Sequence, residues 1–118
     1  MYKERRIVPR YSAHLKASLR PLPEGTHLTV NVEDLCVLGC LLEYAPSLEI
    51  RQECELMLDW NGREFRTPAV VAWNSPQGQA GLAFHDTDPA SKALLREICG
   101  DLRLKPLVRV AEEPKSDT

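Results

Sequence analysis

The stretch CELMLDWNGREF, residues 54–65, carries the clearest structural signal in this chain. Every second side chain from Cys54 to Trp60 is apolar and suited to a core, the period of two that a half-buried strand requires. Asn61-Gly62 follows directly, and this dipeptide is the strongest short signal for a two-residue hairpin turn. The stretch therefore predicts an antiparallel hairpin, with a return strand over about residues 63–73.

Working outward, the same alternation marks residues 13–20 and 28–33, and shorter apolar runs at 40–44 and 80–84 lie between turn residues. Pro68 indicates a bulge or an edge position within the return strand. Six short strands with close turns predict an all-β fold. We expect a six-stranded antiparallel small barrel, because closure removes the unpaired edges of an open sheet.

The C-terminal part has a different period. Asp88 suits a helix N-cap and Pro89 the first helical position, and the apolar residues at 94 or 95, 98 and 102 recur at helical spacing. We therefore expect a C-terminal α-helix that covers the sheet, with Gly100 either ending it or tolerated within it. The apolar pattern fades from Lys105, so residues 106–118 are expected to form a flexible tail.

The composition fits one globular domain. The chain has 118 residues, 43% hydrophobic and 27% charged, close to the average for soluble proteins. It has no apolar run of the roughly 18 residues that span a bilayer and no signal-peptide core, so we expect a cytoplasmic protein without membrane insertion. Four cysteines are then expected to be reduced and mostly in the core: Cys36, Cys40, Cys54 and Cys99.

The formal net charge of −2 conceals a gradient. Residues 1–20 carry six basic side chains and one acidic, a net +5, whereas the remaining residues carry nine basic and sixteen acidic, a net −7. Such a cluster is either a solvated basic leader or a contact surface for an anion, a phosphate or a nucleic acid.

Two short motifs indicate which kind of ligand the basic cluster could bind. Arg6 and Arg10, separated by three residues and preceded by Arg5, lie just before the first predicted strand. An arginine fork can hold a phosphate bidentately, pair with guanine or stack on a purine. Further along, Asp34 and Gly39 flank the connection between the second and third predicted strands. A carboxylate there can accept hydrogen bonds from guanine, although an Asx-type turn with a glycine bulge explains the same residues.

In this order on a six-stranded pattern, the motifs resemble the PilZ domain family of bacterial receptors for cyclic di-GMP. R-x-x-x-R is matched at Arg6 and Arg10. The second motif, [DN]-x-S-x-x-G, is matched at Asp34 and Gly39 but has Cys36 in place of serine. Residues 71–73 (VAW) and 81–84 (GLAF) resemble the closing strands of the family, so the resemblance covers nearly the whole chain.

The resemblance implies a division into a basic ligand-binding segment at 1–12, a PilZ-like barrel with its helix at 13–105, and the tail. It also implies that arginines grip the phosphates and guanines of cyclic di-GMP and that the second motif meets the guanine edge. The expected ligand-binding residues are Arg5, Arg6, Arg10, Asp34, Cys36 and Gly39.

Cys36 leaves two functional hypotheses open, because a thiol is a weaker donor and acceptor than a hydroxyl. In the first, this single-domain PilZ protein binds cyclic di-GMP and relays it to an unidentified protein partner in motility, pilus or surface-behaviour control. In the second, a degenerate PilZ-like domain no longer binds the nucleotide and acts as a protein-interaction adaptor in motility or pilus function.

Other classes of function fit less well. No nucleophile elbow, Walker loop, H-E-x-x-H or carboxylate pair is recognisable, so we do not expect an enzyme or a cofactor. The cysteines and histidines lack zinc-site spacing, so no metal is expected. Nucleic acid is not expected as a partner, because the chain beyond residue 20 is acidic and most of its aromatic residues fall at strand positions that core packing explains.

Overall fold

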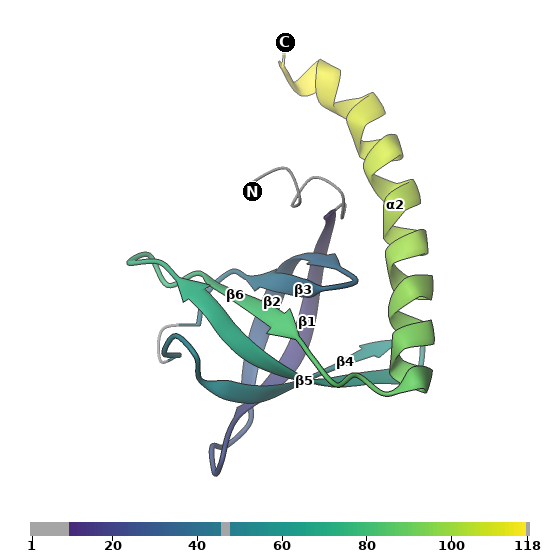
Figure 1. Ribbon diagram of the computed structural model, residues 1–118. Helices are drawn as coiled ribbons and strands as arrows, with labels where there is room; N and C mark the ends of the chain where they lie inside the picture. The colour runs from purple at the N-terminus through teal and green to yellow at the C-terminus, as the bar shows by residue number, and fades with distance from the viewer. Residues whose placement is uncertain (1–9, 46–47, 118) are drawn as a thin grey trace, which may run out of the picture.

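The computed structural model describes residues 10–45 and 48–117, with side chains described as far as Arg103. The strands pair antiparallel in a closed barrel with the order β1-β2-β3-β6-β5-β4, and one helix follows (Figure 1). This confirms the predicted six-stranded barrel with a C-terminal helix. The elements are β1 (Tyr11–Pro21), β2 (Leu28–Cys36), β3 (Gly39–Leu42), β4 (Glu53–Trp60), β5 (Arg63–Asn74), β6 (Ala80–Phe84) and α2 (Pro89–Asp117).

The predicted hairpin is the β4–β5 pair. Trp60 faces Arg63 across the turn, and the two turn residues, Asn61 and Gly62, have φ angles of 54° and 85°. Positive φ at both central positions matches the twist of the flanking strands. The register shows no shift at Pro68, which lies just past the last β5–β6 pair at Ala69. Pro68 pairs with Glu55 of β4, and its carbonyl accepts a hydrogen bond from the His85 N–H, so it does not lie at an open edge. The register shift of β5 falls between Val71 and Trp73, so the bulge does not lie at Pro68 either.

The alternating residues of the strands fill the barrel. The even-numbered residues from Cys54 to Trp60 are buried, and Phe65 on β5 is fully buried with them. All four cysteines are buried free thiols, as expected from the sequence. The core of the barrel is therefore built from strand residues that the alternating pattern predicted to face inward.

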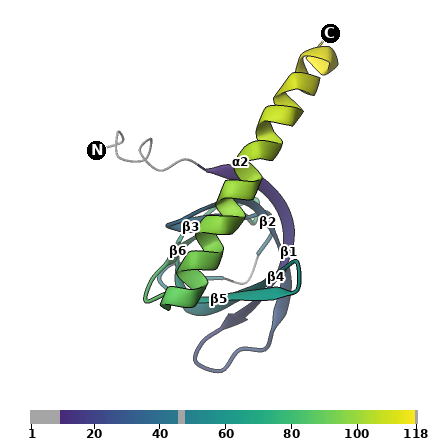
Figure 2. The same ribbon diagram turned by 90° about the vertical axis from the view of Figure 1, so that its right-hand side faces the viewer.

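Helix α2 begins as predicted, because the Ser91 N–H donates a hydrogen bond of 2.7 Å to Asp88 Oδ1, an N-cap contact. Its buried side chains among the described residues are Ser91, Leu94, Leu95, Ile98, Cys99 and Leu102, and it packs against β1, β2 and β5. In Figure 2 the strands form a ring and the first half of α2 lies across it. Gly100 is within the helix.

The backbone of α2 continues to Asp117, past the boundary predicted at Lys105. Side chains beyond Arg103 are outside the described residues. The expectation that residues 106–118 form a separate tail therefore stays a prediction.

An imidazole joins the segment before α2 to the start of β4. His85 Nε2 lies 2.9 Å from Glu53 Oε1, and His85 Nδ1 lies 3.0 Å from Asp86 Oδ2. The hydrogen bonds to Asp86 and then to Glu53 raise the pKa of His85 above its ordinary value. A pKa raised by folding means that the stabilisation is present below the unfolded pKa and is lost as the pH rises through the folded pKa.

Replacement of His85 by alanine is therefore expected to reduce the free energy of unfolding more at about pH 5.5 than at about pH 8.5. Urea unfolding of both proteins at the two pH values measures the difference. An equal loss at both would show that the charged imidazole contributes nothing to stability.

Candidate functional site

The first and second motifs meet on one face of the barrel. Arg10 immediately precedes β1, and Asp34 lies on β2 opposite Ser12 of β1. Arg10 Nη2 is 3.9 Å from Asp34 Oδ2, and 63% of the Arg10 side chain is exposed. The structure therefore brings these two predicted site residues together and leaves the guanidinium free to meet an anion from solvent.

Local irregularities in two strands surround this pair. The β1–β2 register shifts between Ser12 and Leu15, where His14 has a φ of 51°, and the β2–β3 register shifts between Val32 and Asp34. Bulges of this kind bend a strand and redirect its side chains. The sequence interpretation placed residues 34–39 between the second and third strands, with an Asx-type turn as one explanation of Asp34. That assignment was wrong, because β2 continues through Asp34 to Cys36 and the bulge precedes the carboxylate.

The Asp34 carboxylate is mostly enclosed and incompletely hydrogen-bonded. Only 19% of its side chain is exposed. Burial raises its pKa above the ordinary value, and the nearby Arg10 charge opposes part of that rise. Oδ1 is buried and has no hydrogen-bond partner among residues 10–45 and 48–103. Because a buried acceptor without a partner is unfavourable, this oxygen is suited to accept an N–H from a ligand.

Cys36 lies at the tip of the β2–β3 hairpin. It pairs with Gly39, so residues 37 and 38 form the turn. The Leu38 N–H donates to the Cys36 Sγ at 3.4 Å, and the Leu38 carbonyl accepts a hydrogen bond of 2.9 Å from the Phe84 N–H. The thiol thus has the backbone partner that a hydroxyl at this position would also reach, and the hairpin tip is held beside β6.

Gly39 has a role in the fold as well as a place in the site. A Cβ built at this position would fall on the carbonyl oxygen of Leu82, because β3 passes close to β6 here. No left-handed φ is involved, since the structure gives positive φ only for Gly62 and Gly78 among the described glycines. Close approach of the two backbones therefore requires the glycine.

A hollow of about 190 Å³ joins these residues to an aromatic side chain. Trp73 on β5 lines it together with Arg10 and Asp34, and 43% of Trp73 is exposed. Core packing therefore fails to explain Trp73, and the same holds for the exposed Tyr44. These two residues are exceptions to the expectation that core packing explains most of the aromatic residues. The full lining is Arg10, Asp34, Cys36, Leu38, Gly39, Cys40, Ala72, Trp73, Gly81, Leu82 and Ala83.

Gly81 is the feature of the sequence that indicates where Trp73 lies. Trp73 pairs with Gly81 across β5 and β6, and a Cβ at Gly81 would fall on the indole ring. An aromatic side chain that covers a glycine on the neighbouring strand is a known device of β-sheets. The missing side chain of Gly81 therefore leaves the space that the indole of Trp73 occupies beside β6. Arg5 and Arg6, the other expected site residues, lie outside the described residues.

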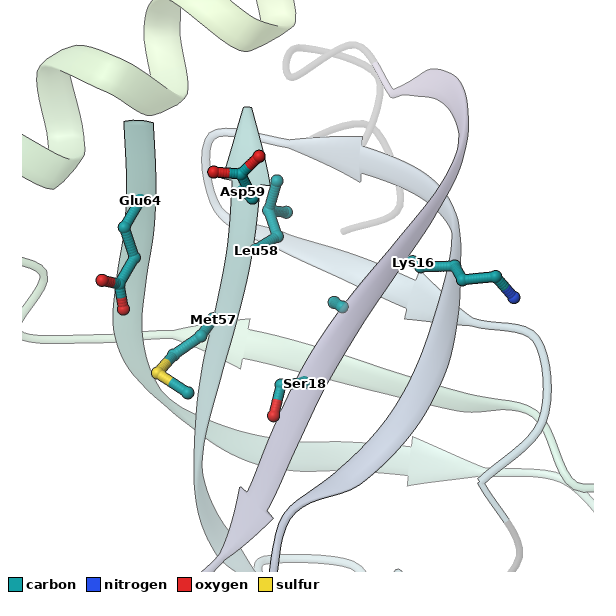
Figure 3. A pocket seen from close by; sticks show the side chains of 7 residues that line it. Lys16, Ser18, Met57, Leu58, Asp59 and Glu64 are labelled. Carbon is teal, nitrogen blue, oxygen red and sulfur yellow. The ribbon is translucent and has the colours of Figure 1, made fainter. Parts of the chain in front are cut away.

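A larger hollow of about 410 Å³ lies between β1 and β4. These strands pair only over Ser18–Pro21 and Cys54–Met57, so they separate toward their other ends. Figure 3 shows Lys16 pointing away from Asp59 and Glu64, so the charged groups do not converge. The hollow contains none of the motif residues, and the motif site is the stronger candidate.

The described part of the chain contains neither a metal-binding cluster nor a membrane-spanning helix. No group of three or more histidine, cysteine or acidic residues there is placed to hold a metal ion. No helix among the described residues is long and apolar enough to cross a membrane.

The fold and site define a small closed β-barrel domain with an arginine–carboxylate pair and an exposed indole around one hollow. The PilZ domain family model matches residues 3–101, and the chain therefore belongs to the PilZ family. No curated protein sequence matches the chain significantly.

Solved PilZ structures share the fold. The PilZ domain of Escherichia coli YcgR with c-di-GMP is 20% identical, has a TM-score of 0.66, and is matched over 97% of this chain and 99% of its own. K. pneumoniae MrkH with c-di-GMP is 19% identical with a TM-score of 0.65, covering 84% of this chain and 52% of its own. The Bacillus subtilis inhibitor of motility, MotI, is 17% identical with a TM-score of 0.67, over 83% and 51%. This chain thus spans about half of the last two proteins.

Proposed function

We propose that this PilZ domain is a receptor for cyclic di-GMP and that it passes the signal to a protein partner. The observation that carries the proposal is the hollow in which Arg10, the mostly enclosed Asp34 carboxylate and the exposed Trp73 meet. The structures of the YcgR domain and of MrkH, which contain c-di-GMP on the same fold, support it.

Each group has a complementary part of the ligand. Guanine presents two N–H donors, N1–H and N2–H, on one edge, and a carboxylate such as Asp34 accepts both. The flat guanine ring can stack on the indole of Trp73, and the Arg10 fork can hold a phosphate oxygen pair. The family resemblance assigns similar phosphate and guanine contacts to Arg5 and Arg6. No bond is made or broken, so the proposed mechanism is binding without catalysis.

The expected weak point of the site is Cys36. A serine hydroxyl at this position would accept from the Leu38 N–H and donate its own proton toward a ligand phosphate, whereas a thiol does both weakly. A hydrogen bond to a charged group contributes roughly 1.5 to 3 kcal/mol, which corresponds to about tenfold to hundredfold in affinity.

Isothermal titration calorimetry of the full chain with cyclic di-GMP tests the proposal. We expect saturable binding by the native protein, and affinity about tenfold to hundredfold higher for Cys36→Ser. Cys36→Ala is the matched control, because it removes the thiol without adding a hydroxyl, and it should not gain affinity. Cyclic GMP, with one guanine and one phosphate, controls for nonspecific nucleotide binding.

The second candidate is an adaptor that does not bind the nucleotide. The observation that favours it is the same thiol at the position of the motif serine. If neither the native protein nor Cys36→Ser gives heat with cyclic di-GMP, the receptor proposal is wrong and the adaptor hypothesis replaces it.

A further inference from the structure

A second groove lies on the other side of the β2–β3 hairpin tip. It encloses about 450 Å³ between the tip, the segment that follows β6 and the first turns of α2. That volume admits several side chains of a bound peptide. We call it the hairpin–helix groove, and its lining is Val37, Leu38, Phe84, His85, Asp86, Thr87, Lys92, Leu95 and Arg96.

One wall of this groove is exposed apolar surface. Val37 and Leu38 are 44% and 60% exposed, although both are large aliphatic side chains at adjacent positions. Phe84 is half-buried beside them, and the buried Leu95 of α2 contributes apolar lining from the other side. Adjacent apolar side chains at the rim of a concave surface are typical of interaction sites.

The other wall carries two cations that have no partner among the described residues. Lys92 and Arg96 are exposed and four residues apart, so they share one face of α2. Neither has an ion-pair or hydrogen-bond contact from its side chain within the described part of the chain, whereas Arg63 on β5 pairs with Glu97 at 2.8 Å. Asp86, the acidic residue in the lining of the groove, is hydrogen-bonded to His85. Two unpaired positive charges therefore border the groove in a part of the chain whose net charge is −7.

We propose that the hairpin–helix groove docks an acidic amphipathic segment of a partner protein. Its apolar side chains would pack on Val37, Leu38 and Phe84, and its carboxylates would meet Lys92 and Arg96. A bilayer or a nucleic acid would need a broader basic surface than two cations beside a concave apolar wall. A peptide with both apolar and acidic groups fits both walls.

The groove is adjacent to the candidate nucleotide site. Leu38 lines both hollows, and its carbonyl accepts a hydrogen bond from the N–H of Phe84, which lines the groove. An occupant of either hollow would therefore contact the same side chain. The docking proposal does not depend on nucleotide binding, because its observations concern the groove alone.

Three labelled peptides of about sixteen residues test the proposal by fluorescence anisotropy with the full chain. They share leucines at i, i+3, i+4 and i+7 and differ only in flanking glutamate, glutamine or lysine. We expect the glutamate peptide to bind at least about tenfold more tightly than the lysine peptide. The variant K92E/R96E is expected to reverse this order, and K16E/R51E, with the same change of charge on exposed residues outside the groove, is expected to keep it.

Several results would overturn the proposal. One is the absence of saturable binding of the glutamate peptide up to about 1 mM. Another is an unchanged order of affinities in K92E/R96E while its melting temperature equals that of the native chain. Tighter binding to phosphatidylglycerol vesicles or to single-stranded RNA than to the peptide, dependent on the same two cations, would assign the surface to those partners. A dimer lost in K92E/R96E by sedimentation equilibrium would assign it to a second copy.

Discussion

Alanine in place of Arg10 is expected to weaken cyclic di-GMP binding by roughly a hundredfold or more. A bidentate guanidinium–phosphate contact comprises two charge-assisted hydrogen bonds, each worth roughly 1.5 to 3 kcal/mol. The substitution should leave the melting temperature unchanged. Arg10 is largely exposed, and its distance of 3.9 Å from Asp34 is too long for a strong ion pair. Calorimetry and thermal unfolding of the same preparation measure both effects.

Two matched variants separate charge from geometry at Arg10. Arg103→Ala removes an exposed arginine from α2 and is expected to bind like the native protein. Arg10→Lys keeps the charge but lacks the planar fork, so we expect intermediate affinity. If Arg10→Ala and Arg103→Ala bind equally well, Arg10 does not hold the ligand and the proposed site is misplaced.

Gly39→Ala is expected to lower the stability of the barrel by roughly 1 to 3 kcal/mol or more, the usual cost of inserting atoms into a packed region. The added methyl group would fall on the carbonyl oxygen of Leu82, so β3 and β6 would have to separate. For a domain of this size the melting temperature should fall by roughly 5 to 15 °C. Nucleotide affinity should fall with it, because the β3–β6 contact forms one wall of the hollow.

Gly100→Ala is the matched control for this substitution. Gly100 lies inside α2, and a Cβ there has nothing within 4 Å. Alanine is favoured over glycine in a helix interior by roughly 0.5 to 1 kcal/mol, so this variant should be slightly more stable than the native protein. A Gly39→Ala protein as stable as Gly100→Ala would contradict the close approach of β3 and β6.

The sequence was sufficient to predict the elements where a local pattern determined the structure. Asn61-Gly62 specified the two-residue turn of the β4–β5 hairpin, and Asp88-Pro89 specified the start of α2. Both depend on contacts within a few residues. The barrel followed because six alternating segments with short connections leave few other ways to pair every strand.

The site was predictable only in part, because its geometry depends on register between distant strands. The motif spacing selected Arg10 and Asp34, which the structure brings together. It did not show that a bulge precedes Asp34 on β2, because an extra residue leaves the alternation on either side intact. The exposure of Trp73 was not predicted, because a pattern of period two does not show that Trp73 faces Gly81 on the neighbouring strand.

The hairpin–helix groove had no signal in the sequence. Val37 and Leu38 come from a hairpin, while Lys92 and Arg96 come from a helix more than fifty positions later. Only the packing of α2 against the barrel brings these segments together. The charge gradient along the chain gave no indication of the groove either, because Lys92 and Arg96 belong to the part of the chain whose net charge is negative.

The most direct test of the receptor proposal is an amide NMR spectrum of the ¹⁵N-labelled full chain with and without saturating cyclic di-GMP. We predict that the largest shifts occur at the amides of Asp34, Leu38 and Gly39 and at the indole N–H of Trp73, because these groups line one hollow. Unchanged signals at these positions, or shifts confined to the β1–β4 hollow around Lys16 and Met57, would contradict it.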